Sequence, residues 1–163
     1  MFCTMKKYLR PTLLALLVIL LSAQFYRPER NQSDEQKHAM SAQYPMPASV
    51  ESTFKAACYD CHSNYTQYPW YAEIQPVRWW LDGHIKNGKS HLNFSTFSEQ
   101  DLADQHHQMD EITEVLEKSE MPLRSYTWIH SAAQLSEAQV SELLTWTRTQ
   151  MATIGQPALL EGR

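Results

Sequence analysis

Two cysteines three residues apart, followed at once by a histidine, constrain the fold of this chain more than any other feature. They form the sequence Cys58-Tyr59-Asp60-Cys61-His62. A helical turn that carries two thiols and an imidazole can present all three to one bound group.

The spacing C-x-x-C-H is that of c-type haem attachment. Each thiol can add to one of the two vinyl groups of a haem, and the adjacent histidine then supplies the proximal iron ligand. The motif predicts one covalent haem c, attached at Cys58 and Cys61, with its iron ligated by His62.

Two other chemistries fit a pair of cysteines at this spacing. A thioredoxin-type redox centre opens a helix after a strand, and no α/β pattern surrounds this motif. Half of a zinc site would need two further ligands. The chain offers five histidines for that role: His84, His91, His106, His107 and His130.

The sixth iron ligand is less constrained than the proximal one. We favour Met121 in Glu120-Met121-Pro122, because proline disfavours helix at the preceding residue and c-type haems are often ligated by a His/Met pair. An open sixth position is another possibility, as is ligation by a histidine. The histidine candidates are His84, His91 and His130.

The N-terminus resembles an export signal. Lys6, Lys7 and Arg10 precede the apolar run Leu13–Leu21, which is the order of a secretory segment. The stretch 8–26 approaches the ~20 residues that span a bilayer. We predict a signal anchor or signal peptide over residues 1–26, a hydrophobic helix that tethers the protein to the inner membrane with the rest in the periplasm.

The chain beyond this segment is acidic, since the overall net charge is −4 and the first 24 residues contain basic but no acidic side chains. This argues against nucleic acid as a partner and fits redox partner proteins with a basic patch. We predict a polar linker over residues 27–48, a haem-binding domain over 49–155 and a C-terminal tail over 156–163.

Four helices are predicted, and the absence of paired strand signals indicates an all-α domain. The first begins with Ser49 as its cap and delivers the cysteine motif. The second covers Val77–Asn87 and ends at Gly88. The third runs from a Ser98 cap to about Lys118. The fourth opens with a capping box from Ser136 to Gln139 and stops at Gly155.

The chain also resembles the small haem-binding-domain proteins of bacteria, which belong to the broad cytochrome c group. The resemblance is carried by CYDCHSNYTQYPWY at 58–71, QPVRWWLDGHIKNGKSHLNFS at 75–95 and EMPLRSYTWIH at 120–130. It implies a cytochrome c-like helical fold around one haem c, with attachment at Cys58 and Cys61, ligation by His62 and export to the periplasm. Met121 occupies the M-P position that similar cytochromes use for the distal ligand.

Two functions follow from these expectations. The favoured one is a one-electron carrier, because a haem with two protein ligands needs no substrate pocket. The alternative is a haem enzyme or sensor for peroxide or a small gas, with an open or labile sixth position. No paired catalytic constellation is recognisable, so a non-enzymatic role is expected.

Overall fold

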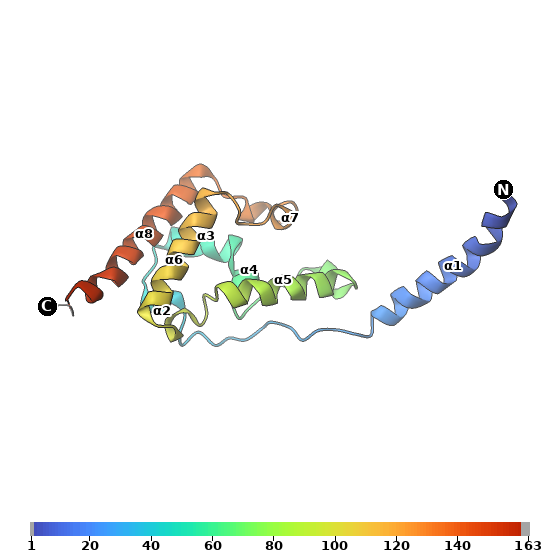
Figure 1. The fold of residues 1–163 in the computed structure, drawn as a ribbon, viewed down its shortest axis with the longest axis horizontal. Coiled ribbons are helices and arrows are strands. Elements are labelled where there is room, and N and C mark those ends of the chain that lie inside the picture. Colours follow the sequence, from blue (N-terminus) through green and yellow to red (C-terminus); the bar gives the residue numbers. More distant parts are fainter. Residues whose placement is uncertain (1, 161–163) are drawn as a thin grey trace. The chain divides into compact units, whose positions relative to one another are not determined.

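The computed structural model describes the backbone of residues 2–160 and the side chains of residues 8–155. Within these ranges the regular structure is helical, with one isolated antiparallel bridge between Gln32 and Tyr65 (Figure 1). The prediction of an all-α fold is therefore confirmed. The chain divides into two compact units, residues 1–30 with 67–84 and residues 31–66 with 85–163.

The first unit contains α1 (Phe2–Ala23), the 3₁₀ helix η1 (Trp70–Glu73) and the beginning of α5 (Val77–His91). Gln75 joins its two chain segments: its backbone N–H donates to Oε1 of Gln24 at 3.0 Å and its Nε2 donates to the Tyr26 carbonyl at 2.9 Å. Arg78 is buried and donates to the Pro28 carbonyl.

The N-terminal helix α1 does not have the bounds predicted for a membrane anchor. It ends at Ala23 rather than Tyr26, and Pro11 interrupts its apolar sequence. Among the helical residues whose side chains are described, none forms a segment long and apolar enough to cross a bilayer.

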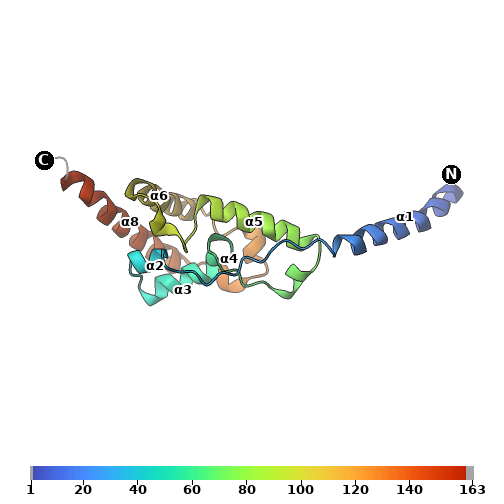
Figure 2. The ribbon, with the colours of Figure 1, turned by 90° about the horizontal axis from the view of Figure 1, so that it is seen from below.

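The second unit holds the core. Its α-helices are α2 (Met40–Gln43), α3 (Ala48–Ala57), α4 (Tyr59–His62), α6 (Leu102–Glu117), α7 (Arg124–Thr127) and α8 (Glu137–Leu160), with the C-terminal part of α5 and the 3₁₀ helices η2 (Phe97–Glu99) and η3 (Ser131–Ala133). Figures 1 and 2 show α6 and α8 side by side. Together with α3 they form the core, in which Phe54 of α3, Met109 of α6 and Leu143 of α8 are buried.

The predicted linker over residues 27–48 is not separate from the domain. Met40 is fully buried and Tyr44 is 6 % exposed, and both belong to the core of the second unit. The Tyr44 hydroxyl donates to Oε1 of Gln105 at 2.6 Å. The polar residues around Met40 and Tyr44 hid this contribution, because two isolated apolar side chains show no helical period.

Helix ends follow the local signals in some places and not in others. The capping box at Ser136 is confirmed, since the Gln139 N–H donates to its Oγ and its own N–H donates to Oε1 of Gln139. The third predicted helix begins later than expected: Asp101, not Ser98, caps α6 and accepts a hydrogen bond from the Asp104 N–H at 2.9 Å.

The predicted cap of the first helix is also wrong. α3 already begins at Ala48, with Pro47 before it, and Ser49 lies inside the helix, where its hydroxyl donates to Glu142 of α8. Two helices continue past the glycines that were predicted to end them. α5 runs through Gly88 to His91, and α8 runs through Gly155 to Leu160. A helical glycine costs only about 1 kcal/mol relative to alanine, which packing of the helix readily offsets.

Candidate functional site

The cysteine motif forms one tight turn at the end of α3. The Cys58 N–H still donates to the Phe54 carbonyl of α3 at 2.8 Å, and the Cys58 carbonyl accepts from the His62 N–H at 3.0 Å. Cys58 therefore closes α3 and opens α4, so the two thiols and the imidazole all lie on one turn. This is the placement that the sequence predicted.

His62 is held in a defined tautomer. Its Nδ1 lies 3.2 Å from the Leu92 carbonyl oxygen, which can only accept a hydrogen bond, so Nδ1 carries the proton and Nε2 keeps its lone pair. Burial lowers the pKa of His62, an effect that the Leu92 and Gly88 carbonyls partly oppose and that nearby His91 adds to. A neutral imidazole with one nitrogen fixed by a carbonyl is the form that ligates metals.

Gly88 explains why α5 can pass directly behind the motif. A Cβ at this position would lie 2.8 Å from the Cys61 carbonyl oxygen and 3.3 Å from Cys61 Cβ. Only glycine permits this approach between two backbones. Gly88 thus acts through close packing of α5 on α4, instead of ending the helix as predicted.

The thiols of Cys58 and Cys61 are free and only partly exposed. Burial raises the pKa of Cys58 to about 12, with a further contribution from Cys61. Burial also raises the pKa of Cys61 to about 11, with a further contribution from Asp60. Both are therefore neutral thiols at physiological pH.

A cavity of about 360 Å³ opens beside this turn, within the 300–1,000 Å³ that is usual for cofactor pockets. Cys58, His62 and Met121 all line it, whereas Cys61 is not among its lining residues. Its walls are mainly apolar and come from α3, α5, α6 and the loops that follow α5 and α6. The apolar wall residues are Phe54, Leu92, Phe94, Ile112, Val115 and Leu116.

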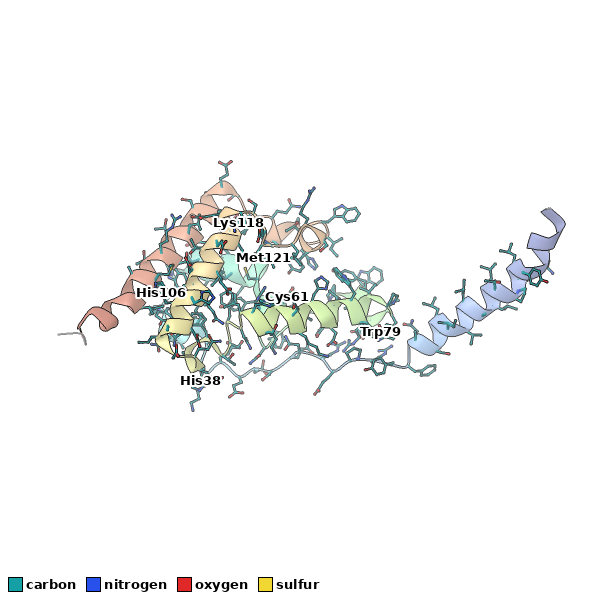
Figure 3. The ribbon with its side chains drawn as sticks, in the orientation of Figure 1. His38, Cys61, Trp79, His106, Lys118 and Met121 are labelled. Carbon is teal, nitrogen blue, oxygen red and sulfur yellow. The ribbon has the colours of Figure 1, made fainter. Side chains whose placement is uncertain are left out.

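Met121 reaches the cavity because the chain reverses after α6. Ser119 adopts a left-handed conformation with φ of 55°, and the Glu120 N–H donates back to the Val115 carbonyl at 2.9 Å. Figure 3 shows Met121 beyond the end of α6 and Cys61 on α4, on two elements that are distant in the sequence. The structure thus brings Met121 and His62 to one cavity.

One polar atom in the cavity wall has no partner. Gln108 is 9 % exposed, and its Nε2 donates to the His91 carbonyl at 3.0 Å. Its Oε1 is buried without a hydrogen-bond partner among the described atoms. Buried acceptors without a partner are rare in folded proteins.

Tyr126 is a residue of this region that sequence reasoning missed. Its hydroxyl donates to Oδ2 of Asp60, between the two cysteines, at 2.8 Å. Burial and the Asp60 carboxylate raise the pKa of Tyr126 well above its ordinary value. The two residues are 66 positions apart, and nothing in the local sequence of either indicates the other.

The histidines proposed as alternative ligands have different places. His91 lines the cavity, with Nδ1 2.8 Å from the Asn87 carbonyl. His130 stacks on Tyr126 with the ring centroids 4.1 Å apart and does not line the cavity. His84 lies in the first unit, with Nδ1 2.9 Å from the Trp80 carbonyl. Across the described residues, no three His, Cys, Asp or Glu side chains are grouped to hold a metal ion, so the zinc alternative lacks a ligand set there.

Comparison with known protein families gives a match for this chain. The haem-binding domain family matches residues 18–149, which includes the cysteine motif, α5, α6 and Met121. No curated protein and no solved structure matches the chain. Because the matched region covers most of the sequence and contains the whole cavity, the chain belongs to the haem-binding domain family.

Proposed function

We propose that the protein is a c-type cytochrome in which haem is attached through Cys58 and Cys61 and its iron is ligated by His62 and Met121. The observation that carries the proposal is that Met121, from the loop after α6, lines the same cavity as Cys58 and His62 of the motif turn. Cys61 directly precedes His62 in α4 and would supply the second thioether.

The residues present suit a haem. The tautomer of His62 leaves Nε2 for the iron, because Nδ1 is engaged by the Leu92 carbonyl. Phe54, Phe94 and Leu116 provide apolar contacts for a macrocycle and exclude water from it. A haem supplies one-electron redox chemistry when it is bound. Two protein ligands, one from α4 and one from the loop after α6, then favour the role of an electron carrier.

Three carboxylates at the cavity support the proposal that redox partners dock here through a basic surface. Glu111, Glu114 and Glu120 line the cavity, and Glu114 pairs with Lys118. Association with such a partner should slow as the salt concentration rises.

The N-terminal segment motivates the further proposal that the protein is exported. Lys6, Lys7 and Arg10 before the apolar run Leu13–Leu21 have the order of a secretory segment. Cell fractionation of the haem-loaded protein tests this: recovery from the periplasm or from the membrane after osmotic shock supports export. Recovery with the cytoplasmic proteins would contradict it.

The attachment test uses the full chain expressed with a c-type maturation system. Covalent haem is measured by its stain on a denaturing gel for the wild type, Cys58→Ala, Cys61→Ala and the control Cys3→Ala. We expect each motif variant to lose haem or keep it through one thioether, and Cys3→Ala to match the wild type. Full covalent haem in both motif variants would rule out attachment at these residues.

Absorption spectra test the ligation. The wild type should show the weak long-wavelength band of an iron–thioether bond in its oxidised form. Met121→Ala should abolish it, whereas Met151→Ala should preserve it, because Met151 packs against the core and does not line the cavity.

An enzyme or gas sensor is the second candidate, favoured by His91 and Gln108 in the cavity wall. These groups offer a hydrogen bond to a small ligand of the haem. A high-spin wild-type spectrum that shifts when carbon monoxide is added would put this candidate first.

A further inference from the structure

The loop that carries Met121 is joined to the haem-attachment turn by a side chain. After α6, residues 118–123 lead into the short helix α7, which contains Tyr126. The Tyr126 hydroxyl donates to Oδ2 of Asp60 at 2.8 Å. The residue at one end of this bond follows the proposed distal ligand closely in the sequence. The residue at the other end lies between the two attachment cysteines.

The tyrosine end of the bond is held in a fixed orientation. The Tyr126 ring stacks on His130 with an interplanar angle of 19°. The ring Nδ1 of His130 lies 3.0 Å from the Tyr126 carbonyl, so the same histidine also engages the backbone of α7. Since its ring is stacked in this way, the tyrosine loses little further freedom when its hydroxyl binds Asp60.

The aspartate end is equally fixed. The Asp60 carbonyl accepts a hydrogen bond from Thr66 Oγ1 at 2.6 Å, which ties the α4 turn to the segment that follows it. The Thr66 N–H in turn donates to the Asn31 carbonyl at 2.8 Å. The carboxylate that meets Tyr126 therefore belongs to a rigid turn, and a hydrogen bond to a carboxylate is stronger than one between neutral groups.

We infer that Tyr126 is a positioning residue, which holds the loop of Met121 over the turn that carries His62 and so keeps the methionine on the iron. The inference rests on the proposed ligation by His62 and Met121. Loss of the Tyr126 hydroxyl frees the loop to move away from α4. Met121 then leaves the iron more often, and an added ligand takes its place.

The test compares Tyr126→Phe with wild type as the haem-loaded full chain. The phenylalanine keeps the ring that stacks on His130 and removes only the hydroxyl. Imidazole binding to the oxidised protein is followed by the loss of the iron–thioether band. We expect Tyr126→Phe to bind imidazole about tenfold faster or more tightly, which is the order of effect of one hydrogen bond to a charged group. Asp60→Asn should shift binding in the same direction by a smaller factor, because an amide oxygen still accepts a hydrogen bond but carries no charge.

A matched control separates positioning from stability. The Tyr44 hydroxyl also makes a buried hydrogen bond, to Gln105, but Tyr44 does not line the cavity. Tyr44→Phe should lower the unfolding midpoint and leave imidazole binding unchanged. If Tyr126→Phe and Asp60→Asn also bind imidazole as the wild type does, the positioning role is wrong while the ligation stands. A wild type without the iron–thioether band overturns the proposed ligation, and the inference with it.

Discussion

Gly88 lies so close to the backbone of Cys61 that a Cβ at position 88 would come within 2.8 Å of the Cys61 carbonyl oxygen. This approach fixes α5 against the attachment turn. Since α5 leads into Leu92, whose carbonyl holds His62, the contact also sets the position of the proximal imidazole. The absence of a Cβ at Gly88 therefore permits the geometry of the site.

Gly88→Ala should destabilise the haem-loaded protein. Overpacking against a backbone atom costs about 1–3 kcal/mol, which outweighs the gain of up to about 1 kcal/mol for alanine in a helix. Gly83→Ala is the matched control on the same helix, because a Cβ there meets no atom within 4 Å. Urea unfolding followed by circular dichroism should give a lower midpoint for Gly88→Ala and an equal or higher one for Gly83→Ala. Equal midpoints for the two variants would contradict the close approach.

The start of α6 gives a second prediction. Asp101→Ala removes the carboxylate that accepts the Asp104 N–H, so we expect a loss of about 1 kcal/mol in the free energy of unfolding. Ser98→Ala, at the cap position that the sequence suggested, should change it by less than about 0.5 kcal/mol. A larger loss of unfolding free energy for Ser98→Ala than for Asp101→Ala would show that the helix begins at Ser98, as the sequence predicted.

Met40→Ala tests whether the segment before α3 belongs to the domain. Because Met40 is fully buried, its truncation should cost about 2–5 kcal/mol. Gln43→Ala, on the exposed side of α2, should cost less than about 0.5 kcal/mol. If both variants lower the thermal unfolding midpoint by the same small amount, residues 40–44 are part of a linker and not of the domain.

The cysteines give a pH-dependent prediction for the chain before haem attachment. Burial raises the pKa of Cys58 to about 12 and that of Cys61 to about 11, so the reactive thiolate is scarce below these values. At pH 8 we expect alkylation by iodoacetamide to be about tenfold slower in the folded chain than in urea. The rate in the folded chain should continue to rise towards pH 11.

The same shifts make the haem-free fold less stable in alkali. The folded state keeps its thiols protonated above the pH at which the unfolded chain loses its protons. This contribution to stability is therefore complete below the ordinary thiol pKa and is lost as the pH rises towards 11–12. A haem-free chain whose alkylation and unfolding were independent of pH between 8 and 11 would contradict the burial of the thiols.

Local chemistry made part of the fold predictable. The turn at Cys58, the capping box at Ser136 and the start of α5 after Pro76 each depend on neighbours in the chain. Features set by packing were not predictable. α5 continues through Gly88 because α4 lies against it, and Met40 reaches the core although its own neighbours are polar.

The site shows the same division. The thiols and the imidazole of the motif follow from one short pattern, and the structure adds a cavity beside Cys58 and His62. The carbonyl that holds His62 comes from Leu92, and the partner of Asp60 comes from Tyr126. Both are long-range contacts between residues without distinctive patterns. A single sequence gives no information on which of these residues lie close together in space.

The hydrogen bond of His62 to Leu92 closes 30 residues of chain, whereas that of Tyr126 to Asp60 closes 66. The two contacts therefore differ in sequence separation, and the shorter loop closes at a lower entropic cost. A chain that emerges N-terminus first presents both cysteines and the Leu92 carbonyl before Met121 exists as part of a fold. We expect the side with the cysteines to assemble first, which would give a maturation enzyme access to the thiols before the loop of Met121 is in place.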